Sequence, residues 1–248
     1  MSGHSHFATI KRAKEAKDLQ KGKIFSKHAR AISLAVKAGG GPDPSSNYKL
    51  RMAIEAARAD NLPKENIERS ITKASAEVQN LEEYSYEGFG PFGVSVIVDA
   101  ATDNRNRTAQ ELKNIFERGG GNMGGPGSVS YNFENKGMIK VGKTQNTGEQ
   151  ILELIDLGVD DYEEVENELI LYTPYERTGE LRDAIASKNY TVVSTQSIKK
   201  AKNTINIADI EKAKKIISFV QKLEEHEDVQ NVYTNVTIND DILSHIEL

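Results

Sequence analysis

The sequence predicts an α+β protein, with an N-terminal three-helix bundle followed by two α+β (ferredoxin-like) domains, one inserted in the other. Apolar residues recur at helical spacing through the first quarter of the chain, and β-branched runs alternate with helical segments after it. Between residues 136 and 200 the expected elements follow the order β-α-β-β-α-β, which is the ferredoxin-like arrangement. A length of 248 residues exceeds one typical domain and fits several units.

The chain begins with a basic arm of about twenty residues, which combines a small polar start with four cations and holds too few large apolar groups to fold alone. The next segment, Lys21 to Ala38, carries apolar side chains at helical spacing and predicts an amphipathic helix. The helix is expected to stop at Gly39-Gly40-Gly41-Pro42, because glycine and proline end helices.

Two further helices complete the predicted bundle. The second is expected to start near Ser45 or Ser46, either of which can cap it, and to reach Asn61. The third begins with Pro63 and runs through Ile71, since a proline in the first turn lacks only an amide that has no helical partner there.

The pattern changes after an acidic linker from Glu77 to Glu83. Val94 to Val98 is a β-branched run typical of a buried strand. Asp103 then opens a helix that Gly119 closes. Ser128 to Phe133 alternates with period two, which predicts a half-buried strand and completes a β-α-β unit.

The remaining elements are expected to divide between an inserted unit and a tail. The inserted unit has, in order, strand Met138–Val141, helix Glu149–Leu157, strands Val159–Glu164 and Glu168–Tyr172, helix Arg177–Ser187 and strand Thr191–Thr195. The tail has strand Thr204–Ile207, helix Asp209–Leu223 and strand Val229–Ile238. Joined to the earlier β-α-β segment, the tail would form a second unit of similar plan. We therefore expect three domains, made of residues 1–80, residues 84–134 with 201–248, and the inserted residues 136–200.

Charge is divided unevenly along the chain. Residues 1–75 hold 15 Lys and Arg against 7 Asp and Glu, a net charge of +8, whereas the remainder, with 17 against 30, carries −13. Clustered cations gain free energy by displacing counterions from phosphates, so the basic segment predicts a nucleic-acid partner. A solvated basic surface is the alternative interpretation of the same pattern.

Several classes of protein are disfavoured. The absence of cysteine excludes disulfides, thiolate catalysis and cysteine zinc sites, and it fits a reducing, cytoplasmic location. The N-terminus has no apolar signal core, and no apolar run is long enough for a membrane span. No P-loop, nucleophile elbow or metalloprotease motif occurs, so we expect no enzyme, no cofactor and no small-molecule substrate.

Two patterns resemble functional motifs but lack the required context. Gly88 to Gly93 matches G-x-G-x-x-G, yet a dinucleotide site must open a helix, whereas these glycines precede a strand and predict a turn. His4 and His6 form an H-x-H pair with no evident third ligand, so no metal site is predicted.

Two other segments allow more than one interpretation. Thr102 to Thr108 places capping residues and two arginines, Arg105 and Arg107, at a helix start. Thr102 or Asp103 would cap the helix while the arginines pair with carboxylates, or the arginines would contact phosphate or a partner. The Gly119–Gly127 segment contains six glycines, which deny it a fixed shape when unbound, and it either links helix to strand or approaches an RNA backbone.

Seven segments occur in the same order as in one known family. They are Gly3-His4-Ser5-His6-Phe7, Gly22-Lys23-Ile24-Phe25-Ser26-Lys27, Gly39-Gly40-Gly41, Asn61 to Arg69, Tyr86 to Pro91, Thr102 to Thr108, and Gly120-Gly121-Asn122 with Gly127-Ser128-Val129. The chain thereby resembles the YebC/PmpR family, which includes the mitochondrial translational activator of cytochrome c oxidase. It departs from the usual family pattern at His6-Phe7, Thr9 and Phe92.

The resemblance implies a three-domain fold with a helical N-terminal domain, no catalysis, and regulation of gene expression. It points both to DNA-binding transcriptional regulators and to ribosome-associated factors that ease translation of proline-rich stretches. We expect phosphate contacts, to DNA or to RNA of the ribosome, from Lys11, Arg12, Lys14, Lys17, Lys21, Lys23, Lys27, Arg30, Lys49, Arg51 and Arg58. The alternative is a protein-interaction module in which the acidic unit recruits partners and the basic helices dock against it.

Overall fold

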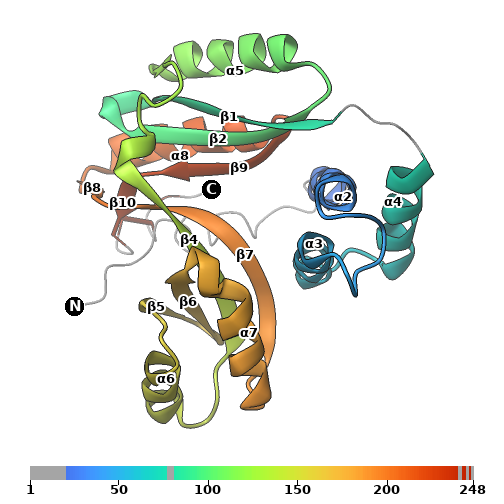
Figure 1. Ribbon diagram of the computed structural model, residues 1–248. Helices are drawn as coiled ribbons and strands as arrows, with labels where there is room; N and C mark the ends of the chain where they lie inside the picture. The colour runs from blue at the N-terminus through green and yellow to red at the C-terminus, as the bar shows by residue number, and fades with distance from the viewer. Residues whose placement is uncertain (1–20, 77–80, 240–241, 244–245, 247–248) are drawn as a thin grey trace.

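The computed structural model describes residues 21–76, 81–239, 242–243 and 246 (Figure 1). It opens with the three expected helices, α2 (Lys21–Ala38), α3 (Tyr48–Ala59) and α4 (Lys64–Ala76). Helix α2 packs on the other two, and Ile32, Leu50, Ile54 and Ile67 form their common core. The predicted helical bundle is confirmed.

The start of α3 corrects the prediction that a serine caps it. Asn47 is the cap, and its Oδ1 accepts a hydrogen bond from the Leu50 amide at 2.9 Å. The buried Asn47 amide group also donates to the carbonyls of Ala35 and Gly41, so it fastens the glycine turn to α3. Neither serine hydroxyl caps the helix, because both donate to Asp43 in the preceding turn. A β-carbon on Gly39 would lie 1.9 Å from Asn47 Oδ1, which explains one glycine of this turn.

The first sheet contains strands β1 (Glu82–Phe89), β2 (Ser95–Thr102), β3 (Asn122–Met123) and β9 (Val229–Thr234). Its strands are antiparallel in the order β3-β1-β2-β9, and the short helix η2 (Pro91–Gly93) connects β1 to β2. Helices α5 (Arg105–Gly119) and α8 (Ile210–Glu224) pack together, with Phe116 and Phe219 edge to face at 5.3 Å.

This unit differs from the prediction in two respects. Glu82 and Glu83, expected in a linker, already belong to β1. Because β1 and β2 form a hairpin before α5, the unit does not repeat the β-α-β-β-α-β plan expected for it. Strand β1 could not be predicted from β-branched residues, because its sequence EEYSYEGF contains none.

The second sheet follows the predicted order. It contains β4 (Phe133–Gly142), α6 (Thr147–Asp156), β5 (Asp161–Val165), β6 (Glu168–Pro174), η4 (Tyr175–Arg177), α7 (Thr178–Ser187) and β7 (Val192–Ala201). Its strands are antiparallel in the order β5-β6-β4-β7. The β-α-β-β-α-β order and this strand arrangement are those of the ferredoxin-like fold.

The two sheets face each other between two pairs of helices. Val96 and Val98 of β2 pack with α5 and α8, whereas Ile97, from the same strand, packs with β4 and β6 of the second sheet. The opposite face of the second sheet packs on Leu154 of α6 and Leu181 of α7. Strand β2 is thus buried on both faces, which explains its continuous β-branched run.

The predicted strand at Ser128–Phe133 is wrong, since Ser130–Asn132 forms the short helix η3 and β4 begins only at Phe133. The tail contributes β8 (Ile205–Ile207) and β10 (Val236–Ile238), which pair in parallel. Strand β9 pairs with β2 although the whole second sheet lies between them in the sequence. The division into three domains stays a prediction. None of the described helices is long and apolar enough to cross a membrane.

Candidate nucleic-acid interface

The predicted phosphate contacts fall into three groups in the structure. Those of the arm, Lys11, Arg12, Lys14 and Lys17, lie outside the described residues, as does the side chain of Lys21. Lys23, Lys49 and Arg58 are exposed on the helical bundle. They are the members of the predicted set that the described part of the chain leaves accessible to a phosphate backbone.

The other predicted contacts of the bundle have internal partners. Lys27 donates to the Glu224 carbonyl, and Arg30 reaches the carboxylate of Asp228 and, at 3.3 Å, the Ala101 carbonyl. Spaced three residues apart on α2, both cations face the corner between α8 and β9. Arg51 donates to the Pro44 and Ser45 carbonyls at 3.0 and 3.1 Å and lies over the Tyr48 ring.

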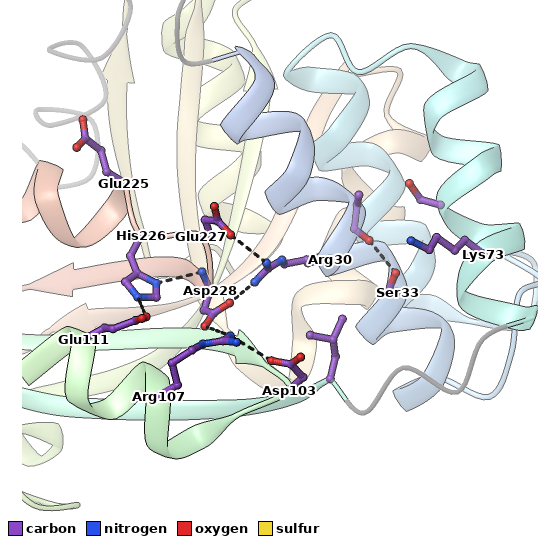
Figure 2. A pocket seen from close by; sticks show the side chains of 13 residues that line it. Arg30, Ser33, Lys73, Asp103, Arg107, Glu111, Glu225, His226, Glu227 and Asp228 are labelled. Carbon is purple, nitrogen blue, oxygen red and sulfur yellow. Dashed lines mark hydrogen bonds and ion pairs between the residues drawn. The ribbon is translucent and has the colours of Figure 1, made fainter.

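Asp228 is the centre of the contact between the bundle and the first sheet (Figure 2). Its carboxylate is 3% exposed and accepts from Arg30 of α2, from Arg107 Nη2 at 3.0 Å and from Thr108 Oγ1 at 2.7 Å. Burial alone would raise its pKa, but the hydrogen bonds from Thr108, Arg30 and Arg107 outweigh burial and hold the pKa at about 2. One carboxylate thus joins α2, α5 and β9.

A cavity of about 910 Å³ lies around this carboxylate, between the bundle, the start of α5 and the α8–β9 connection. Three cations line it (Arg30, Lys73 and Arg107), together with five acids (Asp103, Glu111, Glu225, Glu227 and Asp228). Because the acids outnumber the cations, and two of the cations already bind Asp228, the cavity is poorly suited to phosphate.

Glu111, His226 and Asp228 are a group that could hold a metal, since one donor atom from each lies within 4.8 Å of the others. Their hydrogen bonds argue against it. The Asp228 amide donates to His226 Nδ1 at 3.1 Å, so a neutral imidazole carries its proton on Nε2 and donates to Glu111 at 2.8 Å. Both nitrogens are then engaged, and the Asp228 oxygens already accept from three groups.

The two arginines at the start of α5 behave differently from each other. Arg107 binds Asp228 and also Asp103, at 3.1 Å, whereas Arg105 lies over the Tyr84 ring at 5.2 Å. The cap of α5 is Asn104, whose Oδ1 accepts from the Arg107 amide, and not Thr102 or Asp103 as predicted. Asn104 lies three residues before Arg107, which is the spacing at which a short capping side chain reaches the third amide of a helix.

The glycine-rich segment has a defined conformation, which corrects the expectation that it lacks one. Residues of β3 pair with β1, and the buried Glu87 carboxylate accepts from the amides of Gly127, Val129 and Ser130 at 2.8 to 2.9 Å. Although burial alone would raise the Glu87 pKa, these amide hydrogen bonds lower it. They also turn the chain into η3, which is why no strand forms before Phe133.

Of the G-x-G-x-x-G glycines, Gly90 and Gly93 belong to the predicted turn, which joins two antiparallel strands, whereas Gly88 is a paired residue of β1. They open no phosphate-binding helix. A β-carbon on Gly88 would lie 2.6 Å from the Asn122 carbonyl, and Gly93 has a φ of +77°. Packing and backbone conformation therefore account for these two glycines.

Sequence reasoning missed several of the groups that matter here. Lys37 and Arg69 are also exposed on the bundle, and their positive charge could have indicated them. Asp228, Glu87 and the contact of Phe92 with α8 depend on pairings between distant segments, which no local pattern reveals.

Comparison with known proteins agrees with the sequence resemblance. Residues 5–77 match the family model described as the TACO1/YebC protein N-terminal domain, and residues 81–236 match the TACO1/YebC second and third domain. Probable transcriptional regulatory proteins of Thermoanaerobacter pseudethanolicus and Brachyspira hyodysenteriae are 46% and 42% identical, with 97% and 98% of this chain and 99% of each relative aligned.

A solved structure shows the same fold. The crystal structure of a conserved hypothetical protein from Aquifex aeolicus superposes with a TM-score of 0.81 at 42% identity, and the match covers 90% of this chain and 93% of the other. Taken with the two family models, which together span most of the sequence, these similarities show that the chain belongs to the TACO1/YebC family.

Proposed function

We propose that the protein is a non-enzymatic, nucleic-acid-binding regulator of gene expression that holds phosphate backbones with its basic N-terminal region. The observation that carries the proposal is the charge division, +8 in residues 1–75 and −13 in the remainder. A basic segment attached to an acidic body is attracted to a polyanion at one end only, so the interaction has a direction. The relatives' name, probable transcriptional regulatory protein, supports this class of function.

The structure supports two separate roles for the cations, internal contacts for some and phosphate binding for others. Lys27 and Arg30 of α2 fasten the bundle to the body, and Arg107 of α5 binds the same Asp228 from within the body. We assign the three cations these structural roles in place of phosphate binding. The arm cations and the exposed side chains of the bundle are then the phosphate contacts, namely Lys23, Lys37, Lys49, Arg58 and Arg69. The three predicted domains remain part of this proposal, with residues 1–80 as the nucleic-acid-binding one.

The proposal is tested by the salt dependence of binding. Replacing Lys11, Arg12, Lys14 and Lys17 by glutamate should weaken binding to both duplex DNA and single-stranded RNA. It should also reduce the slope of log K against log salt by about 0.9 for each lost duplex contact and about 0.7 for each lost single-strand contact. Fluorescence anisotropy of a labelled oligonucleotide, titrated at several salt concentrations, measures both quantities.

A matched control reverses four exposed lysines outside the bundle, Lys113, Lys188, Lys202 and Lys222. This variant has the same net charge as the test variant, so it corrects for the overall charge of the molecule. Equal loss of affinity in the two variants, or an unchanged slope in the test variant, would refute the assignment of the arm.

DNA and the ribosome are distinguished by the species bound in cells. Cross-linking in living cells, with the recovered nucleic acid sorted into rRNA, mRNA and genomic DNA, decides between a transcriptional regulator and a translation factor acting at proline-rich stretches. Genomic DNA enriched at few sites supports the first role, and rRNA supports the second.

The second candidate function, a protein-interaction module, has one favouring observation. Leu152 and Ile155 of α6 are 64% and 46% exposed and lie three residues apart on one face of the helix. Loss of a captured protein on replacing both by serine, together with unchanged nucleic-acid affinity in the arm variant, would favour this function over the first.

A further inference from the structure

An aromatic ring is displayed at the β1–β2 turn. Phe92, the middle residue of η2, is 48% exposed and has φ 63° and ψ 22°, a left-handed conformation that glycine adopts far more readily. Burial does not explain phenylalanine here, because half of the residue remains in solvent. A residue kept in an unfavourable conformation, where glycine would fit, suggests a use for its side chain.

Backbone hydrogen bonds and packing fix the turn that carries this ring. The Gly90 amide donates to the Val94 carbonyl at 2.7 Å, and the Gly93 amide donates to the Gly90 carbonyl at 3.3 Å. A β-carbon on Gly90 would lie 2.8 Å from Phe219, so the turn is seated directly on α8. The ring therefore projects from a fixed base.

Two lysines of α8 lie over the Phe92 ring. Lys212 Nζ and Lys215 Nζ are 5.6 and 5.5 Å from the Phe92 ring centroid, and both side chains are exposed. Within the part of the chain that the structure describes, neither ammonium group has a carboxylate partner, whereas the neighbouring Lys214 pairs with Glu211 at 3.0 Å. Lys200 also lies near an aromatic ring, 3.7 Å from the centroid of Tyr172, but Tyr172 is only 1% exposed, whereas Phe92 is half exposed.

A half-exposed aromatic ring in contact with two ammonium groups has the chemistry of a single-stranded nucleic-acid contact. Any base can stack on an aromatic ring, and lysines within reach of that ring can neutralise the flanking phosphates. A duplex offers its bases in the grooves only, so a single projecting ring suits unpaired nucleotides better.

We propose that Phe92, Lys212 and Lys215 form a second nucleic-acid contact, in which an unpaired base stacks on Phe92 and the lysines bind adjacent phosphates. Strand β1 begins beside the helical bundle and runs away from it, so this contact lies at the opposite end of the first sheet (Figure 1). The site goes beyond the proposed function of the basic arm and does not require it.

The sequence offers a direct spectroscopic test, because the chain contains no tryptophan. Phe92→Trp places a single indole at the site, and base stacking quenches indole fluorescence. We expect saturable quenching by twelve-residue oligoadenylate, as RNA and as DNA, but not by inorganic polyphosphate, which supplies the charge without a base. Tyr175→Trp is the matched control, since Tyr175 is also 48% exposed but lies on η4 in the other sheet domain.

Loss of the two lysines should weaken this signal in a predictable way. With Lys212 and Lys215 replaced by glutamate in the Phe92→Trp protein, the log–log salt slope for the single strand should fall by about 1.4. Quenching at saturating oligonucleotide should persist when the arm cations are reversed, which separates this site from the proposed function of the arm.

Three outcomes would overturn the proposal. They are equal quenching by polyphosphate, equal quenching in the Tyr175→Trp protein, and a salt slope that the lysine variant leaves unchanged. Quenching by RNA but not DNA would support the site and add recognition of the 2′-hydroxyl. If Phe92→Trp does not fold, Phe92→Gly, which suits the backbone, should lower single-strand affinity without changing the circular dichroism spectrum; unchanged affinity would again refute the site.

Discussion

Replacing Asp228 by asparagine removes the charge that joins α2, α5 and β9 while keeping the size of the side chain. The Asp228 pKa of about 2 lies below its ordinary value of 3.8, so the folded state favours the ionised carboxylate. The difference corresponds to about 2 kcal/mol of folding free energy at pH 7. That figure is an upper value, because Arg30 and Arg107 are 28% and 46% exposed and solvent screens both pairs.

The pH range follows from the direction of the shift. A carboxylate whose pKa is depressed by folding contributes fully above its unfolded pKa, and the contribution is lost as pH falls through the folded pKa. We therefore expect Asp228→Asn to lower the free energy of unfolding by about 2 kcal/mol at pH 7 and by about 1 kcal/mol at pH 3. The difference from the wild type should nearly vanish at pH 2.

Urea denaturation followed by circular dichroism, at several pH values between 7 and 2, measures this difference. The control is Asp103→Asn, which removes the exposed partner of Arg107 and should cost less than about 1 kcal/mol at any pH. If wild type and Asp228→Asn lose stability in parallel as pH falls, the Asp228 carboxylate is not the group that stabilises this contact.

Two further predictions concern the glycine-rich segment. Gly121→Ala should lower the free energy of unfolding by about 1 to 3 kcal/mol, because its β-carbon would lie 2.2 Å from the Phe89 carbonyl. Gly125→Ala, with no atom within 4 Å, should change it little, and equal denaturation midpoints for the two would contradict the packing. Glu87→Gln should cost about 1 to 3 kcal/mol and speed hydrogen exchange at residues 127–130, since an amide side chain replaces the acceptor of three backbone bonds. Exposed Glu83→Gln is its control, and unaltered exchange after the Glu87 change would refute the assigned role.

The sequence predicted those parts of the fold that local pattern determines. The three helices of the bundle follow from apolar periodicity, and the order of elements in the second sheet follows from alternating strand and helix signals. The caps of α3 and α5 lie one or two residues after the predicted ones. Asn47 and Asn104 cap these helices in place of the nearby serine, threonine and aspartate, because their side chains reach the amide of the third helical residue.

Features that depend on contacts between segments far apart in the sequence were not predicted. Strand β1 forms because it pairs with β2 and β3. The Ser128–Phe133 segment does not form a strand, because the carboxylate of Glu87, some forty residues earlier, accepts hydrogen bonds from its amides. Arg30 was placed among the phosphate contacts because charge is visible in the sequence, whereas its partner Asp228 is almost two hundred residues away. A cation count cannot separate exposed cations from those that hold the fold together.

Cross-linking of nucleic acid to the intact protein in living cells, with mass spectrometry of the nucleotide-bearing peptides, tests the central claim most directly. The account predicts adducts within residues 1–80, with a further adduct on the peptide that carries Phe92. Adducts confined to residues 136–200, or none on the basic region while partner proteins are recovered instead, would contradict it.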